Sequence, residues 1–170
     1  MKTTFKDILK KILENPVLLS VALLIVAVVI LFAMTEITRQ PDLRDDAKVV
    51  VRIDRAQLQA TVAASAAART KGLSGTESLG ENRGLLFVSG QREIPVIYMH
   101  GMNYPIDIIW ISQGTVSEVT PDVQPQPGVP EDQLTKYHPA GPADQVLETP
   151  AGWAAKQSVQ PGDPVKISSL

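Results

Sequence analysis

The apolar residues of the chain fall into one long run and a series of shorter segments. From Val17 to Met34 the sequence carries no charge, and Ser20 is its only polar side chain. As a helix that rises about 1.5 Å per residue, this run spans roughly 27 Å, close to the hydrocarbon thickness of a bilayer. The pattern therefore predicts one transmembrane helix over residues 17–34, with the lipid bilayer as its partner.

The charges on either side of this run predict its orientation. Positive side chains near one end of a span favour retention of that end in the cytoplasm. The run ends in Phe32 to Glu36 without the small residues of a cleavage site, which favours a retained signal-anchor. We expect a single-pass protein of the cell (cytoplasmic) membrane, with its N-terminus inside and its C-terminal domain outside. The positive charges before the span are Lys2, Lys6, Lys10 and Lys11, opposed by Asp7 and Glu14.

Residues 1–16 form a flank with a pattern of its own. Apolar side chains recur at helical spacing, which predicts an amphipathic helix, and Pro16 can begin a second helix. The flank either contacts a lipid surface or a partner helix, or it only sets the topology. Residues 35–47 are charged and polar and predict a linker, so the folded domain is expected over residues 48–170. The recurring apolar residues are Phe5, Ile8, Leu9, Ile12 and Leu13.

Short strands dominate the rest of the chain. Each is a run rich in β-branched or aromatic residues, bounded by Gly, Pro, Asn, Asp or Ser. The fold class is therefore expected to be mainly β (α+β). The predicted strands are residues 48–53, 58–62, 84–88, 95–99, 106–111, 116–119, 145–148 and 165–167.

Two short helices and one hairpin complete the predicted domain. Residues 66–71 follow Ser65 as an N-cap, and residues 151–157 follow Thr149 as an N-cap with Pro150 at the first helical position. Residues 111–116 predict a tight turn between neighbouring strands.

The composition excludes some classes of function. Sixteen Lys and Arg residues stand against 18 Asp and Glu residues, and the net charge of -2 gives no basic surface for nucleic acid. The absence of cysteine excludes disulfides. Six prolines fall within residues 121–142, which predicts either a mobile lid or a rigid surface loop.

The run from Met99 to Ile111 (MHGMNYPIDIIWI) resembles the signature of domain-of-unknown-function family 192. The resemblance implies a compact, barrel-like β fold and no established activity. His100 departs from the signature, since a lysine or arginine is common there. Supporting matches are Ser65 to Leu73, Arg83 to Val88 and Pro142 to Gly162, and further departures are Ala66, Ala68 and Ser74.

Asp107 is the central candidate for a functional site. Strand alternation places it on the face of Ile109 and Ile111. Its carboxyl either accepts N–H bonds from the loop at residues 101–104, or acts as a general base or ligand-binding group. The candidate pocket is formed by His100, Asn103, Tyr104 and Asp107.

Other candidate chemistry has weaker support. Met99, His100 and Met102 could bind copper, but the only other histidine is His138, in the proline-rich loop, so no metal site or cofactor is predicted. Glu118 and Glu148 are interpreted as exposed strand carboxylates that serve solubility or cross-strand pairing.

Three hypotheses for function follow. The leading one is a non-catalytic binding or assembly module for an envelope glycan, peptide or protein. The alternative is an envelope hydrolase-type enzyme centred on Asp107, with residues 121–142 as a lid. Copper binding through Met99, His100 and Met102 is third. Substrate, oligomeric state and release of the domain are left open by the sequence.

Overall fold

A computed structural model describes residues 5–37 and 41–170. The chain divides into two compact units between Gln40 and Pro41. Residues 1–4 of the expected flank and residues 38–40 of the expected linker lie outside the described residues.

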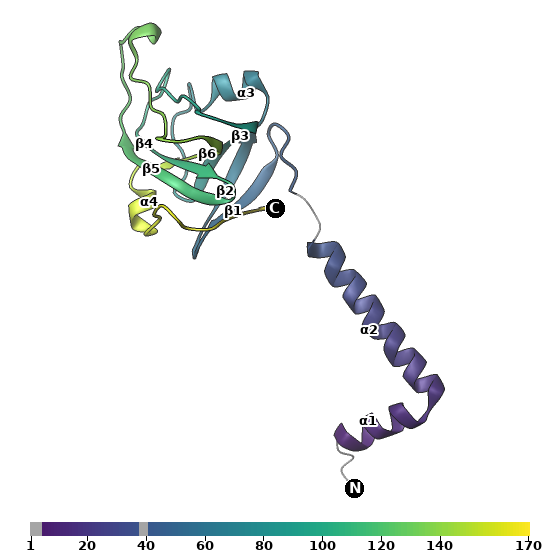
Figure 1. The fold of residues 1–170 in the computed structure, drawn as a ribbon. Helices are drawn as coiled ribbons and strands as arrows, with labels where there is room; N and C mark the ends of the chain where they lie inside the picture. Colours follow the sequence, from purple (N-terminus) through teal and green to yellow (C-terminus); the bar gives the residue numbers. More distant parts are fainter. Residues whose placement is uncertain (1–4, 38–40) are drawn as a thin grey trace. The chain divides into compact units, whose positions relative to one another are not determined.

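The first unit consists of two helices, α1 (Phe5–Glu14) and α2 (Pro16–Ile37), seen in Figure 1. Asn15 caps α2, because its side-chain oxygen accepts the backbone N–H groups of Val17 and Leu18 at 3.0 and 3.2 Å. The amphipathic helix in the flank and the helix start at Pro16 are both confirmed.

The apolar run lies on α2, and most of its described side chains are exposed. Among residues 5–37 and 41–170, no helix has the length and apolarity that a membrane crossing requires. The side chains of Ala33 and Met34, at the end of the expected span, lie outside the described ones. The membrane span stays a prediction.

The second unit is built on one seven-stranded sheet in the order β5-β4-β6-β3-β2-β1-β7. Only β2 and β3 pair in parallel. The first and last strands of this order meet through backbone bonds from Val116 N to Asp163 O (2.9 Å) and from Val165 N to Gly114 O (2.8 Å). The mainly β, barrel-like fold is confirmed. The strands are β1 (Lys48–Ile53), β2 (Ala56–Ala63), β3 (Arg83–Glu93), β4 (Ile106–Ser112), β5 (Thr115–Val123), β6 (Ala143–Pro150) and β7 (Val165–Ser169).

Seven of the eight predicted strands are present, and the hairpin joins β4 to β5 through Gln113 and Gly114, both with positive φ. The strand predicted at residues 95–99 is wrong. Only Ile97 pairs there, in an isolated bridge with Tyr137 whose N–H···O bonds measure 2.9 and 2.8 Å. Pro95 at the start of this segment has no backbone N–H to donate, and the other residues of the segment form no strand pairing.

Alternate residues of the strands fill two apolar cores on opposite faces of the sheet. The central core receives residues from all seven strands and from Trp153. The second core lies on the other face of β3, β4 and β6, where loop residues such as Leu73 and Met99 cover it. β4 is therefore buried on both faces, which explains its nearly continuous apolar sequence.

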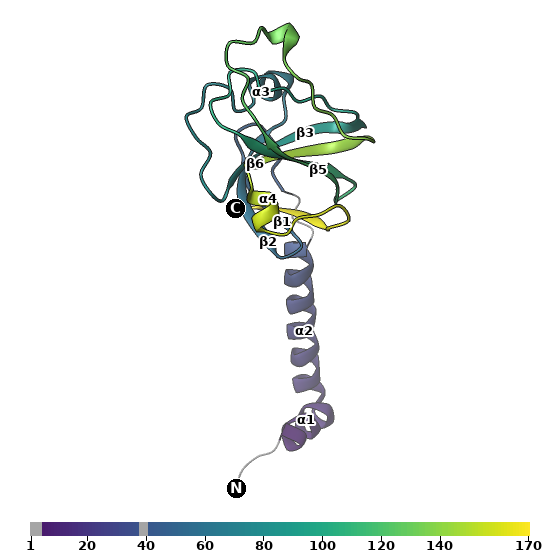
Figure 2. The ribbon, with the colours of Figure 1, turned by 90° about the vertical axis from the view of Figure 1, so that its left-hand side faces the viewer.

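Two short helices lie at different ends of this domain. α3 (Ala66–Lys71) is capped by Ser65, whose Oγ accepts the Ala68 N–H at 3.1 Å, as predicted. α4 (Trp153–Lys156) begins two residues later than expected, and Thr149 does not cap it. In Figures 1 and 2, α3 and the loop that follows β5 lie toward one end of the domain, and α4 lies toward the other. This loop carries a 3-10 turn at Glu131–Gln133.

Candidate functional site

Asp107 is fully buried and bonded to three backbone amides. Oδ1 accepts the N–H groups of Asp122 (2.9 Å) and Gly152 (3.0 Å), and Oδ2 accepts that of Ala154 (2.9 Å). Asp107 shares its face with Ile109 and Ile111 of the central core, as the alternation predicts. The expected donors at residues 101–104 are wrong, because the carboxyl points to the opposite side of the sheet.

These bonds make Asp107 the cap of α4 and a tie to β5. Gly152 occupies the N-cap position and brings no side chain that could accept the first N–H groups of the helix. A carboxylate from the neighbouring strand takes this role, and it also complements the positive end of the peptide dipoles. Both Asp107 oxygens are thereby engaged with the backbone.

Asn103 and Tyr104, in the loop before β4, form hydrogen bonds to the loop after α3. Asn103 Nδ2 donates to Thr76 O at 2.8 Å, and Tyr104 Oη lies 2.6 Å from Thr76 Oγ1. The Thr76 hydroxyl donates to Leu73 O, so the tyrosine hydroxyl supplies the hydrogen between them. Both candidate residues therefore position the loop after α3.

Gly101 allows the same two loops to approach closely. Its carbonyl accepts the Gly75 N–H at 2.8 Å, its φ is +63°, and a Cβ atom there would lie 2.2 Å from Ser74 Oγ. Only glycine fits both the conformation and the contact. The glycine of the signature is therefore a packing requirement.

A cavity of about 190 Å³ lies beside His100, between α3 and residues 96–102, and we call it the Glu148 cavity. Glu148 is 5% exposed, and its Oε2 has no hydrogen-bond partner within the described residues. Burial raises the pKa of this carboxyl to about 8. The interpretation of Glu148 as an exposed carboxylate is wrong, because β6 lies between β3 and β4 and both its faces are covered. The remaining lining residues are Arg69, Thr70, Lys71, Gly72, Leu73, Ser74, Phe87, Val96, Ile97, Tyr98, Met99 and Met102.

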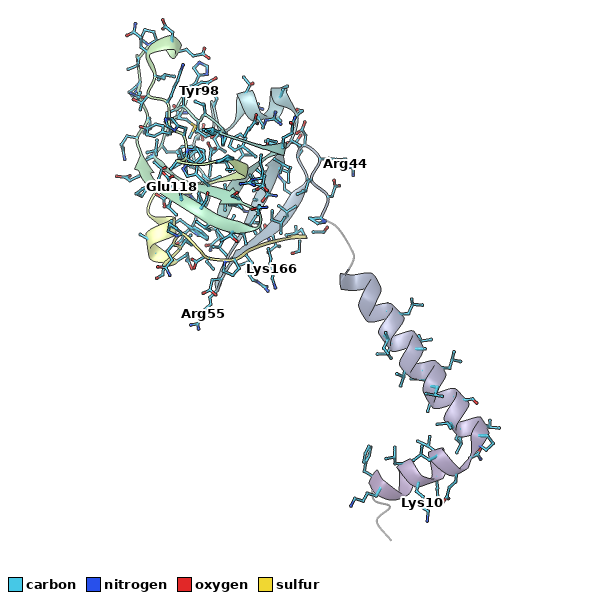
Figure 3. All side chains as sticks on the ribbon, in the orientation of Figure 1. Lys10, Arg44, Arg55, Tyr98, Glu118 and Lys166 are labelled. Carbon is cyan, nitrogen blue, oxygen red and sulfur yellow. The ribbon has the colours of Figure 1, made fainter. Side chains whose placement is uncertain are left out.

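The polar walls of the Glu148 cavity carry positive charge. Arg69 is held in place by its Nη1, which donates to Ala64 O and, at 3.1 Å, to Val88 O. Lys71 is exposed at the end of α3. Tyr98, which Figure 3 labels, has its ring 6.5 Å from that of His100.

Two further groups border this region. The His100 Nε2 atom lies 3.8 Å from Glu131 Oε2, and both side chains are more than half exposed. Burial raises the pKa of Tyr104, its hydrogen bond to Thr76 opposes this rise, and the charge of Glu148 adds to it.

A second cavity of about 230 Å³ adjoins the first and shares Arg69, Phe87, Val96 and Ile97 with it. Asp144 lines it, and strand alternation places Asp144 on the same face of β6 as Glu148. Asp144 Oδ1 is buried without a partner in the described part of the chain, while Oδ2 accepts the Gln113 N–H at 3.2 Å. Both cavities therefore lie against the same face of β6.

The residues of the copper hypothesis share the wall of the Glu148 cavity. Met99 is buried, Met102 is half-buried and His100 is exposed. Across residues 5–37 and 41–170 no group of three or more His, Cys, Asp or Glu side chains could hold a metal ion. Copper binding by thioethers stays a hypothesis.

The structure thus separates Asp107 from the other three predicted site residues, His100, Asn103 and Tyr104. His100 lines the Glu148 cavity, and Asn103 and His100 both line a neighbouring cavity of about 230 Å³. Asp107 lies on the other face of the sheet with α4. Glu118 accepts the Ala140 N–H at 2.9 Å, and His138 is exposed.

Glu148, Arg69 and Lys71 are the cavity residues that the sequence analysis missed as site residues. One signal could have identified Glu148: in the strand segment Gln145 to Pro150, its neighbours Leu147 and Val146 predict burial of opposite faces. A strand buried on both faces must bury any carboxyl that it carries.

Comparison with known proteins gives a family and a fold. The family model DUF192, described as "Uncharacterized ACR, COG1430", matches residues 49–167. None of the curated proteins matches the chain significantly.

Two crystal structures are similar. One is a proposed transcription regulator from Sinorhizobium meliloti 1021, with 24% identity and a TM-score of 0.66 over 75% of this chain and 98% of that one. The other is a protein of unknown function from Novosphingobium aromaticivorans DSM 12444, with 24% identity and a TM-score of 0.62 over 76% and 94%. These likenesses concern the fold alone. The family model covers most of the β domain, and the chain therefore belongs to the DUF192 family.

Proposed function

We propose that this chain is a non-catalytic binding module, tethered to the cell membrane by α2, that takes part of an envelope glycan, peptide or protein into the Glu148 cavity. The observation that carries the proposal is the buried Glu148 carboxyl, which lines the cavity and has one oxygen without a hydrogen-bond partner among residues 5–37 and 41–170. Buried polar atoms are nearly always paired, so an unpaired one in a cavity indicates a partner that binds there.

The arrangement of Asp107 favours this proposal over an enzyme centred on that residue. A general base must reach the proton that it removes. Asp107 is fully buried, and its two oxygens accept three backbone N–H groups. These bonds support a structural role.

The tether in the proposal rests on the sequence of α2. Residues 17–34 are uncharged, and basic residues precede them. Protease added to intact cells should digest the unit from Pro41 to Leu170. Full protection of this unit would contradict its placement outside the cell.

Blocking the mouth of the cavity tests the binding function. Thr70 is exposed and lines the cavity, so Thr70→Trp should obstruct it without disturbing either core. Ser168→Trp, on an exposed position of β7, is the matched control. The full chain, purified in detergent and immobilised, is incubated with a detergent extract of cell envelopes, and retained glycans, peptides and proteins are measured by mass spectrometry.

The proposal predicts a set of retained molecules common to the wild type and Ser168→Trp. Thr70→Trp should reduce their amounts at least tenfold. Equal retention by all three proteins, or no retention above a bare support, would contradict a binding role for this cavity.

A further inference from the structure

We propose that the Glu148 cavity binds a carboxylate group that the envelope ligand carries on a short aliphatic chain, held between the Glu148 carboxyl and the positively charged walls formed by Arg69 and Lys71. This inference rests on the proposed binding function and names the class of its ligand. Three features of the cavity support this ligand class: the hydrogen-bonding group of Glu148, the charges of the lining residues and the volume.

The Glu148 carboxyl can donate a hydrogen bond to a ligand in the cavity. It pairs in register with Leu85 on one side and Ile108 on the other, so both of its direct partners in the sheet are apolar. Its pKa of about 8 leaves it protonated at neutral pH, with one O–H to donate. An ionised oxygen is the strongest acceptor for such a donor.

The charges around Glu148 favour an anionic ligand. The ionisable side chains that line the cavity with it are Arg69 and Lys71 from α3, and Tyr98 and His100 from the loop before β4. The charge of ionised Glu148 also raises the pKa of Tyr104. Arg69 and Lys71 are cationic at neutral pH, and Glu148 is the only carboxyl among the lining residues. An amine would be repelled by these cations, whereas a carboxylate would be attracted.

The size and the apolar walls of the cavity favour a small, partly apolar group. A volume of about 190 Å³ is below the range of roughly 300–1,000 Å³ that is usual for drug-sized ligands. Phe87, Ile97 and Met99 supply apolar surface. The cavity therefore suits a carboxylate on a short aliphatic chain.

Three probes of similar size test the ligand class: butyrate, butyramide and butylamine, which are anionic, neutral and cationic. The full chain in detergent micelles is labelled with ¹³C at its methionine methyl groups, and each probe is added at pH 6.5. Met99 and Met102 report from the cavity wall, and a titration of each probe into protein-free micelles measures its partition into the detergent. Butyrate should shift the Met99 and Met102 signals saturably, at concentrations at least tenfold lower than butyramide requires.

The pH dependence and two variants identify the groups that bind. Butyrate stays ionised above pH 7, so its dissociation constant should rise about tenfold per pH unit well above pH 8, as Glu148 loses its proton. Glu148→Gln keeps a donor and should bind butyrate without this pH dependence. Lys71→Gln should weaken binding severalfold, and Lys166→Gln, an exposed control on β7, should not.

The carboxylate class is overturned if butylamine or butyramide binds as tightly as butyrate, or if none of the three probes shifts Met99 and Met102. Either result leaves the proposed function standing if Thr70→Trp still abolishes retention of envelope molecules. Loss of both effects would overturn the two proposals together.

Discussion

Asp107 and Glu148 lie on adjacent strands, one register position apart, and have opposite surroundings. Asp107 pairs with Thr149 and Glu148 pairs with Ile108, so the two carboxyls point to opposite faces of the sheet. Asp107 meets the N-terminus of α4 and accepts three amide hydrogens. Glu148 meets apolar side chains and a cavity, and its Oε2 is unpaired within the described part of the molecule.

Burial alone does not identify a functional carboxyl. Both groups are almost completely buried, at 0% and 5% exposed. A carboxyl whose bonds are all made within the protein holds elements together, whereas one left without a partner beside a cavity is available to a ligand. This contrast can be tested by substitution.

Glu148→Gln should change how stability depends on pH. The pKa is about 8 in the folded protein and 4.5 in the unfolded chain, so the folded state keeps a proton that the unfolded state releases between these values. Stability should therefore fall as pH rises from 4.5 to 8, by about 5 kcal/mol in total. Urea unfolding at pH 5 and pH 9 should show this loss in the wild type and not in Glu148→Gln. Equal losses in both would refute the unpaired state of Glu148.

Asp107→Asn should destabilise the fold by about 3 kcal/mol, because the amide group replaces an acceptor with a donor facing backbone N–H groups. Glu118→Gln is the matched control, since Glu118 accepts one N–H group from a less buried position, and it should cost about 1 kcal/mol or less. Urea unfolding at pH 7 measures both. If Asp107→Asn costs no more than the control, Asp107 does not hold α4 in place.

Gly101→Ala should cost roughly 2 kcal/mol, from the clash with Ser74 and from the positive φ. Adding Ser74→Gly should recover the part that is due to the clash. Thermal unfolding of the two variants separates these contributions. A neutral Gly101→Ala would show that the loops beside the Glu148 cavity are more loosely packed than described.

Ser65→Ala should destabilise α3 by about 1 kcal/mol, the usual cost of an N-cap. This effect should be smaller than that of Asp107→Asn, because Ser65 supplies one bond locally while Asp107 joins three segments. Hydrogen exchange of the α3 amides should accelerate in Ser65→Ala while the α4 amides stay protected. Faster exchange in both helices would indicate that they unfold together.

The sequence predicts the local parts of this fold well. Alternation in Lys48–Ile53, the cap at Ser65 and the turn at Gln113 and Gly114 all depend on neighbours within a few residues, and the structure confirms each of them. The run at residues 95–99 has the composition of a strand, but it finds only one bridge partner, at Tyr137. Composition cannot reveal whether a partner strand is available.

The candidate site is less predictable because its contacts are distant in sequence. The donors to Asp107 lie 15, 45 and 47 residues further along the chain. Local reasoning selected the amides nearest in sequence, which the fold places on the other face. Glu148 lines a cavity because α3 and residues 96–102 lie around it. Both segments are far from position 148 in the sequence, so the residues next to Glu148 do not predict these contacts.

The most direct test of the account is the pKa of Glu148 itself. The full chain is labelled with ¹³C at its glutamate carboxyl carbons, and the signal of Glu148 is assigned by its absence in Glu148→Gln. The titration midpoint of Glu148 should lie near pH 8 and should rise when butyrate is added. A midpoint near the ordinary value of 4.5 that butyrate does not change would contradict both the unpaired state of this carboxyl and its role in binding.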